Sequence, residues 1–301
     1  MSLSIVNWDA QYAVSATAFW NRLVHGVPHC YEVTGEELAR AAAGEEGAGA
    51  PLQALRDSAV LLAVRAGEVR GYAHFAAERS EDFYAGAGVI RFFGYERGDR
   101  TAGKALLNAV LSELRKRTPE RITAFPSKYR YPCYHFLNAK LSNRLDHVEA
   151  LLGVSGIRRT GAAEIFLDRL DLEDVHNPKP PIPCEVVVEN VPGRGQRPGF
   201  AVRAFRGEDL IGECVHNSGQ EYSPRKDAGE WAFCSWLGVK TPWQGNGLGE
   251  YLLTRALAEA KELGYQHAGI STGGNNYRAF TFYSNHGYRV VDWTYELGCE
   301  R

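Results

Sequence analysis

The sequence has no surplus of positive charge and no long apolar run. Among its 301 residues, 34 Lys and Arg stand against 36 Asp and Glu, so the formal net charge is -2. No block of Lys and Arg could follow a phosphate backbone, which argues against nucleic acid as a partner. No run approaches the roughly 18 apolar residues of a membrane helix, and the N-terminal "MSLSIVNWDAQYAV" lacks the features of a secretory signal. We therefore expect a soluble, cytoplasmic protein with no membrane partner.

The spacing of cysteine and histidine is not that of a metal site. The six cysteines form no C-x-x-C pair, and none of the nine histidines stands in an H-x-x-x-H spacing on a helical stretch. We therefore expect no metal and no disulfide framework. The cysteines are expected to be reduced and mostly buried: Cys30, Cys133, Cys184, Cys214, Cys234 and Cys299.

The length and one change of composition predict two domains. A chain of 301 residues with 45% hydrophobic residues favours two domains of about 150 residues. The strongest break is "DLEDVHNPKPPIPCE", residues 171–185, which is rich in proline and has no hydrophobic period. We predict an N-terminal domain at 1–172, an extended linker at 173–184 and a C-terminal domain at 185–301.

The C-terminal part alternates strands and helices around a glycine-rich turn. Its fourth strand leads into "GNGLG", after which Leu and Ala recur at three-to-four spacing as far as Gly264. The predicted strands are 184–191, 199–205, 210–217, 230–239, 267–272 and 288–297, and the predicted helices are 248–263 and 275–286. This order indicates an α/β fold with a parallel pair of strands at its centre.

The N-terminal part repeats the same order. A hairpin about Ala66-Gly67, a strand at 87–96 and an amphipathic helix from Arg100 to Pro119 are followed by a strand at 121–125. A helix at 142–152 and a strand segment at 156–170 complete the series. An internal duplication would give both parts one plan.

The glycine-rich turn has the composition of an anion site. A turn that leads into a helix directs free backbone N–H groups at one point, where the helix dipole also favours negative charge. Its glycines at 245, 247 and 249 fit neither the dinucleotide spacing G-x-G-x-x-G nor the P-loop. Alone, the turn is equally consistent with a tight connection.

Two motifs together resemble the GNAT acetyltransferases, the Gcn5-related N-acetyltransferase superfamily. The family motif [Q/R]-x-x-G-x-[G/A] follows a strand ending in Val, as Gln244–Gly249 follows Val239 here. The downstream motif N-x-x-A-x-x-F-Y-x-x-x-G-[F/Y] matches Asn276–Ala279, Phe282–Tyr283 and Gly287–Tyr288. The resemblance covers about residues 182–301 and makes the whole chain a tandem member.

The resemblance implies a fold and a co-substrate. Each domain would be a mixed, mostly antiparallel sheet with a splayed central parallel pair and flanking helices, and the C-terminal domain would bind acetyl-CoA. The splayed strand would bind the pantetheine arm together with Asn276, and the N–H groups of the turn would bind the pyrophosphate. The implied binding residues are Leu237, Gly238, Val239, Gln244, Gly245, Asn246, Gly247, Leu248, Gly249 and Asn276.

The resemblance also implies a catalytic acid, whereas the base stays open. Tyr283 would protonate the thiolate that leaves when an amine attacks the thioester. Glu230 is our candidate base, with Asp227, Glu221 and His216 as alternatives, and each is equally a candidate surface residue. Four aromatic residues are assigned either to an acyl or acceptor pocket or to the core: Trp231, Phe233, Trp236 and Trp243.

The N-terminal domain is predicted to be a degenerate copy. Arg100–Ala105 also satisfies R-x-x-G-x-A, with one glycine fewer and a longer approach, and aligning Gly156 with Gly287 puts Leu152 in place of Tyr283. Because leucine cannot protonate a thiolate, we expect this domain to be inert, whether or not it binds CoA.

The C-terminal domain lacks one part of the family plan. Only residues 192–199 separate its first two strands, where GNAT proteins carry two helices that wall the acceptor site. The first domain or a partner subunit of a homodimer would supply that wall.

These features predict an acetyl-CoA-dependent N-acetyltransferase acting on a primary amine of a small molecule, with catalysis in the C-terminal domain. A non-catalytic acyl-CoA-binding or sensing protein is the alternative. The identity of the acceptor and the length of the acyl chain stay open.

Overall fold

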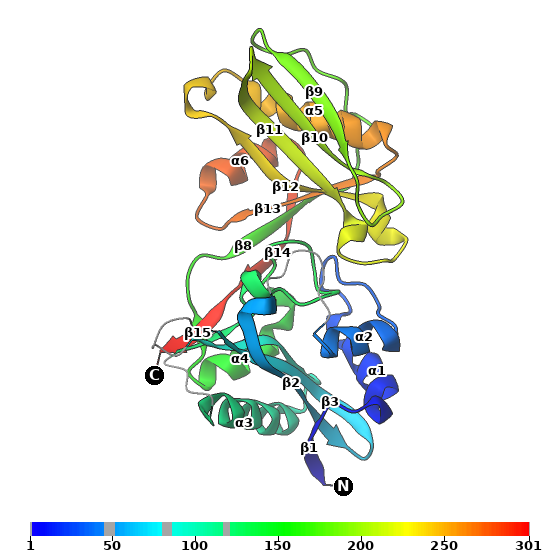
Figure 1. Ribbon diagram of the computed structural model, residues 1–301, viewed down its shortest axis with the longest axis vertical. Helices are drawn as coiled ribbons and strands as arrows, with labels where there is room; N and C mark the ends of the chain where they lie inside the picture. Colours follow the sequence, from blue (N-terminus) through cyan, green and yellow to red (C-terminus); the bar gives the residue numbers. More distant parts are fainter. Residues whose placement is uncertain (1, 45–51, 80–85, 117–120, 301) are drawn as a thin grey trace. The chain divides into compact units, whose positions relative to one another are not determined.

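The computed structural model describes residues 2–44, 52–79, 86–116 and 121–300 (Figure 1). The chain forms two compact units. Unit 1 comprises Met1–Glu164 and Asp292–Arg301, and unit 2 comprises Ile165–Val291. Within the described ranges, no helix combines the length and apolar character that a membrane crossing requires.

Unit 1 is a seven-stranded sheet with helices. Its strands run in the order β1-β2-β3-β4-β5-β15-β7. The hairpin predicted about Ala66-Gly67 is confirmed, since both residues have positive φ (55° and 82°) between β2 and β3. The elements are β1 (Leu3–Asn7), α1 (Ala13–Val24), α2 (Gly35–Ala42), β2 (Leu55–Arg65), β3 (Glu68–Glu78), β4 (Gly88–Tyr95), α3 (Arg100–Lys116), β5 (Arg121–Ala124), β6 (Leu141–Ser142), α4 (Asp146–Val154), β7 (Arg158–Arg159) and β15 (Leu297–Glu300).

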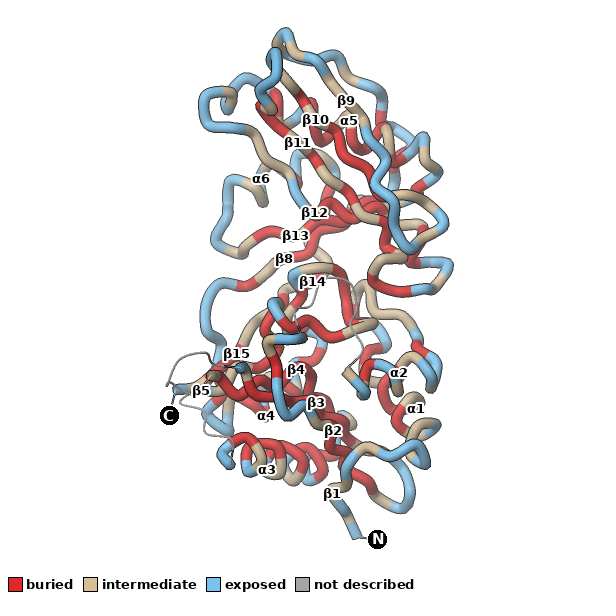
Figure 2. Tube along the Cα trace, viewed as in Figure 1, coloured by how far each residue is buried: buried red, intermediate tan, exposed pale blue. Residues whose placement is uncertain are grey.

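The amphipathic pattern of α3 places its apolar side on the unit 1 sheet. Leu106, Val110 and Leu114 are fully buried, as is β4 along its whole length (Figure 2). Thr34 and Glu37 form a reciprocal capping box at the start of α2. The predicted end of α3 at Pro119 lies outside the described residues.

Unit 2 repeats the plan of unit 1. Its strands follow the order β9-β10-β11-β12-β13-β8-β14, and β6 pairs with the last residues of β14, which belong to unit 1. The elements are β8 (Glu164–Arg169), β9 (Glu185–Val191), β10 (Gly199–Arg206), β11 (Asp209–Ser218), β12 (Trp231–Val239), α5 (Leu248–Glu262), β13 (His267–Gly273), α6 (Tyr277–Asn285) and β14 (Arg289–Tyr295).

Both units contain a short parallel pair that opens at a bulge. β12 pairs with β13 only over Trp231–Cys234, and β4 pairs with β5 only over Gly88–Ile90. One extra residue follows each pair, Ser235 in β12 and Arg91 in β4, as the register shifts against the neighbouring antiparallel strand. Beyond the bulge each strand leaves its parallel partner. The predicted mixed sheet with a splayed central pair is thus confirmed.

The two sheets exchange their last strands. β15, the final strand of the chain, lies between β5 and β7 in the unit 1 sheet, and β8 lies between β13 and β14 in the unit 2 sheet. The prediction of a single strand at 288–297 is therefore wrong. It breaks at Glu296 into β14 and β15, which belong to different sheets. Alternation of apolar residues continues through the break, so the pattern does not reveal a change of partner.

The proline-rich segment does not divide the compact units. Residues 171–184 have no helix or strand, and the segment lies wholly within unit 2. Leu172 and Val175 are buried, and Lys261 Nζ, in the last turn of α5, donates to the carbonyl of Glu173 at 2.5 Å. The unit boundaries fall at 164/165 and 291/292 because the exchanged strands carry the chain from one sheet into the other.

Candidate active site at the end of β12

A pocket of about 500 Å³ opens in unit 2 where β12 leaves β13. The end of β12, the glycine-rich turn, the start of α5 and one face of α6 form its walls. The lining residues are Trp236, Leu237, Gly238, Val239, Gln244, Gly245, Gly249, Asn276, Arg278, Ala279, Phe282 and Tyr283. Most of the residues predicted to bind a ligand are thus brought together around one cavity.

The glycine-rich turn leaves the N-terminus of α5 open. Gly245 and Gly247 have positive φ (80° and 77°), a conformation that costs other residues about 1–2 kcal/mol. Gly247 is the N-cap, and within the described part of the chain no side chain caps the helix. Its first N–H groups and the positive end of the helix dipole therefore remain available to an anion.

The end of β12 is fixed to the turn by Gln244. Gln244 Nε2 donates to Val239 O at 2.8 Å, which holds the turn against the strand. On its other side β12 keeps its antiparallel pairing with β11 as far as Val239. Leu237, Gly238 and Val239 therefore form a supported strand edge along the pocket.

Tyr283 reaches the pocket from α6. It shares one helix face with Ala279 and Phe282 and is only 7% exposed. Burial raises the pKa of Tyr283 well above its ordinary value, with smaller contributions from Cys234 and Cys214. The phenol therefore keeps its proton at neutral pH and can act as an acid.

Asn276 lines the pocket and also caps α6. Its Oδ1 accepts from Ala279 N at 3.2 Å, and its Nδ2 donates to Thr272 Oγ1 at 3.3 Å. Both ends of the amide are therefore engaged within the chain.

The structure does not bring the candidate base to the pocket. Glu230 ends a short 3-10 helix before β12, six residues from Trp236, which corresponds to about 20 Å of extended strand. Asp227 begins the same turn, and Glu221 Oε1 accepts from Arg194 N. His216 is fully buried, and burial lowers its pKa to about 3.

Three residues of the predicted binding set do not line the pocket. Asn246 and Gly247 are exposed in the turn, and Leu248 is buried beneath it. They shape the turn that presents its N–H groups.

Other lining residues were not predicted. Arg278, Ala279 and Phe282 all lie inside the motif that begins at Asn276. A spacing of four residues from Tyr283 could have identified Ala279, and a spacing of three from Ala279 could have identified Phe282.

The aromatic candidates divide between pocket and packing. Trp236 lines the pocket and is 59% exposed. Phe233 stacks with Phe166 in the core, Trp231 contacts His267, and the guanidinium of Arg206 lies over the ring of Trp243.

Residues 169–288 match the family model of the acetyltransferase (GNAT) family. This segment contains the pocket, the turn and Tyr283. Residues 169–288 are a GNAT-family domain.

The whole chain shares its fold with a tandem GNAT protein. A tandem GNAT protein from the clavulanic acid biosynthesis pathway superposes with a TM-score of 0.70 at 13% identity, covering 99% of this chain and 98% of that one. A GCN5-related glucosamine N-acetyltransferase region in a fungal multi-domain GH3 β-N-acetylglucosaminidase gives 0.66 at 14% identity, covering 99% and 38%. A GCN5-related N-acetyltransferase from Sphaerobacter thermophilus gives 0.59 at 14% identity, covering 99% and 95%. No curated protein matches the sequence.

In unit 1, a loop covers the strand that corresponds to the GNAT domain's β12. Phe92 occupies the register of Trp236, one residue after the bulge, and is fully buried. The rings of Trp20 and Tyr131 cover it at 4.3 and 5.2 Å. Tyr131 comes from the segment 125–145 between β5 and α4, whereas only residues 274–276 separate β13 from α6.

The N-terminus of α3 is closed by an acidic side chain. Asp99 Oδ1 accepts from Ala102 N at 3.1 Å, and its carboxylate pairs with Arg65 at 3.0 Å. A capping carboxylate occupies the position that the GNAT domain leaves open at α5.

The predicted alignment of the two glycine motifs is wrong by two residues. Gly103 faces the ring of Tyr95 at the end of β4, as Gly249 faces Val239 at the end of β12. Gly103 therefore corresponds to Gly249 and not to Gly247. The segment that leads from the strand to the helix is shorter in unit 1, where a longer one was predicted. The turn in unit 1 is therefore two residues shorter than the glycine-rich turn before α5.

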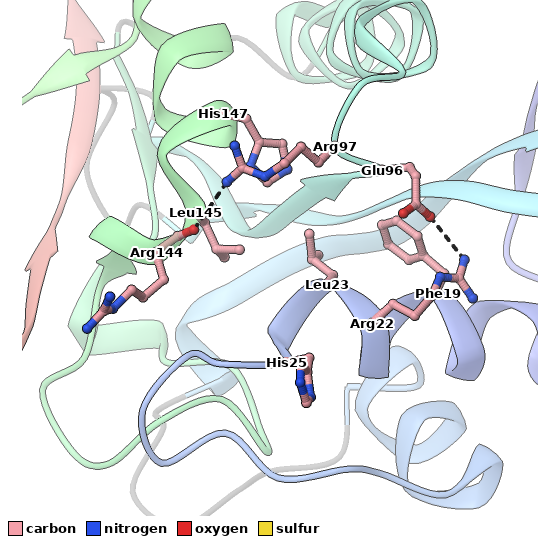
Figure 3. Close-up of a pocket in the computed structure, with 9 residues that line it drawn as sticks. All are labelled: Phe19, Arg22, Leu23, His25, Glu96, Arg97, Arg144, Leu145 and His147. Atoms are coloured by element: carbon pink, nitrogen blue, oxygen red, sulfur yellow. Dashed lines mark hydrogen bonds and ion pairs between the residues drawn. The ribbon is translucent and has the colours of Figure 1, made fainter.

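A cavity of about 180 Å³ remains beside the end of β4 (Figure 3). It is lined by Phe19, Arg22, Leu23, His25, Glu96, Arg97, Arg144, Leu145 and His147. Arg22 pairs with Glu96 at 3.0 Å, and Arg97 Nη2 donates to Arg144 O at 3.5 Å. This cavity is much smaller than the pocket of the GNAT domain.

Proposed function

We propose that the GNAT domain transfers an acetyl group from acetyl-CoA to a primary amine of a small molecule. The observation that carries the proposal is the pocket at the end of β12, where a splayed strand, an uncapped helix N-terminus and a buried phenol meet. The three features suit the three parts of acetyl-CoA: an amide-bearing arm, a pyrophosphate and a thioester.

The residues of the pocket fit this co-substrate. The strand edge at Leu237–Val239 would bind the pantetheine amides as an added strand would. The N–H groups of the turn and of the first turn of α5 would bind the pyrophosphate, and the exposed Arg278 adds positive charge to the lining. Asn276 would border the pantetheine arm.

Tyr283 is the proposed acid. It holds a proton at neutral pH and would give that proton to the leaving thiolate, while a strand N–H near Val239 would stabilise the oxyanion. Positioning the amine beside the thioester would supply much of the remaining acceleration. Glu230 has no part in this scheme because it lies at the other end of β12.

The amine would lose its proton to water. Among the residues that the structure describes, no carboxylate and no histidine line the pocket, so this lining offers no base. This observation also favours the second candidate function, a non-catalytic acyl-CoA-binding protein.

We propose that unit 1 has no catalytic role. Leu152 stands where Tyr283 stands in the GNAT domain, because Ile157 N donates to Leu152 O at 3.0 Å as Tyr288 N donates to Tyr283 O at 3.2 Å. The positive φ of Gly156 and Gly287 supports the same equivalence.

Calorimetric titration of acetyl-CoA into the full chain tests the proposal. We expect one site per chain, followed by release of free CoA when an amine library is added. Binding without turnover on any amine would favour the acyl-CoA-binding alternative. Absence of binding would overturn both candidates, and two sites would contradict the assignment of unit 1.

A further inference from the structure

Two thiols and an imidazole meet in the core of unit 2 behind the pocket. Cys214 and His216 lie on β11, and Cys234 lies on β12. Their ligating atoms all fall within 4.8 Å of one another, and all three side chains are buried. The Sγ atoms of Cys214 and Cys234 are 3.7 Å apart, and Cys214 Sγ lies 3.8 Å from His216 Nδ1.

The backbone explains why these groups converge. Cys214 and His216 are two residues apart on one strand, so both point to the same face of the sheet. His216 stands opposite Cys234 in the register between β11 and β12, directly beside the bulge at Ser235. The ring of Phe200, stacked on His216 at 4.9 Å with an interplanar angle of 4°, fixes the plane of the imidazole.

Two of the three ligand separations are those of a tetrahedral metal site. Zinc binds sulfur at about 2.3 Å and imidazole nitrogen at about 2.0–2.1 Å, so two ligands of a tetrahedron lie about 3.8 Å apart for S–S and about 3.6 Å apart for S–N. The observed separations of 3.7 and 3.8 Å lie within about 0.2 Å of these values. Cys234 Sγ lies within 4.8 Å of the His216 ligand nitrogen, so adjustment of the side chains would bring all three atoms around one ion.

Burying the imidazole of His216 costs free energy. His216 is fully buried, and its Nε2 has no hydrogen-bond partner among the described residues. A buried polar atom without a partner costs about 1–3 kcal/mol, which an apolar side chain stacked on Phe200 would avoid. The other ring nitrogen, Nδ1, faces the weakly hydrogen-bonding Cys214 thiol at 3.8 Å, so a metal bond at Nδ1 would add a stronger interaction to this buried ring.

We propose that Cys214, His216 and Cys234 bind a thiophilic cation, with Zn²⁺ as the reference ion. Two thiol protons pass to solvent as the two sulfur–metal bonds form, so the ion enters as Zn²⁺ and no oxidant or reductant is needed. The ion ties β11 to β12 beside the bulge. Cys234 Sγ also lies 3.4 Å from Trp236 O, so the site supports the first pocket residue of β12 and takes no part in group transfer.

Cobalt substitution tests the site independently of enzyme activity. The full chain is kept reduced with a phosphine, stripped of metal with a chelator and titrated with Co²⁺. We expect one equivalent to bind with a sulfur-to-cobalt charge-transfer band and the intense visible bands of tetrahedral Co²⁺, both removed by Zn²⁺.

Matched variants locate the ion. Cys214→Ser and Cys234→Ser should each lose the charge-transfer band, and His216→Phe, which preserves stacking on Phe200, should weaken binding at least tenfold. Cys184→Ser, a half-buried cysteine of the same unit outside the cluster, should bind as the wild type does. The proposal is overturned if the folded wild type binds no Co²⁺, or if folded Cys214→Ser and Cys234→Ser both keep the spectrum.

Discussion

The splayed strand of unit 2 ends beside a pocket, whereas the corresponding strand of unit 1 ends beneath side chains. In unit 2, Trp236 is 59% exposed and the start of α5 carries no cap. In unit 1, Phe92 in the same register is fully buried, and Asp99 caps α3. Both units keep the bulge and the parallel pair, so these backbone features alone do not make a binding site. Whether the space beside the splayed strand is accessible depends on which side chains the following loops place there.

The largest expected effect tests the proposed acid of unit 2, Tyr283. Tyr283→Phe should lower kcat by about 100-fold or more while leaving the affinity for acetyl-CoA unchanged, because it removes the proton donor and keeps the ring. Steady-state kinetics and calorimetry measure the two quantities. Tyr288→Phe is the matched control, since this ring contacts Tyr283 at 5.8 Å and its hydroxyl has no partner among the described residues. An unchanged kcat in Tyr283→Phe would remove the assigned role.

A pair of glycine variants compares the two helix N-termini. Gly247→Glu should weaken acetyl-CoA binding by at least about tenfold, because it adds negative charge at the uncapped helix and a side chain at positive φ. Gly98→Glu is matched, since Gly98 also has positive φ (91°) and precedes α3. It should bind acetyl-CoA normally. Equal weakening in both variants would show that unit 1 takes part in binding.

The buried polar network of unit 1 should make that unit sensitive to acid. Ser58 Oγ lies 2.7 Å from His74 Nε2, Tyr131 OH lies 3.2 Å from His74 Nδ1, and burial, with the charge of Arg91, lowers the pKa of His74 to about 3. The unfolded chain binds a proton near pH 6.5 and the folded chain does not, so stability is lost as pH falls from about 6.5 towards 3.

The loss should be about 2 kcal/mol between about pH 7 and pH 5. Hydrogen exchange of the β3 and β4 amides, read by mass spectrometry and corrected for intrinsic rates, measures it. His74→Gln should reduce the loss. A pH-independent opening free energy in the wild type would contradict the assignment.

The smallest expected effect concerns a hydrogen bond at the covered end of β4 in unit 1. Tyr95 OH donates to His147 O at 2.9 Å and so links β4 to α4. Tyr95→Phe should lower the opening free energy of β4 by about 1 kcal/mol in the same exchange experiment. Tyr277→Phe, at a residue 72% exposed in unit 2, should change nothing. An unchanged opening free energy would mean that packing alone, without this hydrogen bond, holds β4 against α4.

Local patterns in the sequence were sufficient for the order of elements and for most of the pocket. The spacing from Gln244 to Tyr283 identifies residues that the fold does bring together, because a turn and a helix face are short-range structures. The exchange of β8 and β15 could not be read from the sequence, since a strand's alternation shows which face is buried but not which strand is its neighbour.

Long-range contacts account for the remaining differences. The cover that Tyr131 forms over Phe92 joins residues far apart in the chain, and no local pattern encodes it. Glu230 was chosen for its place before β12, but a strand carries its two ends far apart, and the pocket lies at the other end. Cys214 and Cys234 form a cluster only through strand pairing, which sequence spacing does not reveal.

The exchanged strands give the chain an unusual order of synthesis. A ribosome delivers all the other strands of the unit 1 sheet within the first 159 residues, but the place between β5 and β7 is filled only by Leu297–Glu300, which follow the whole of unit 2. Until then the nascent unit 1 presents two unpaired strand edges, which are sites of mispairing. Completion of the first sheet is thus delayed until unit 2 has been synthesised, and neither half expressed alone would contain a full set of strands.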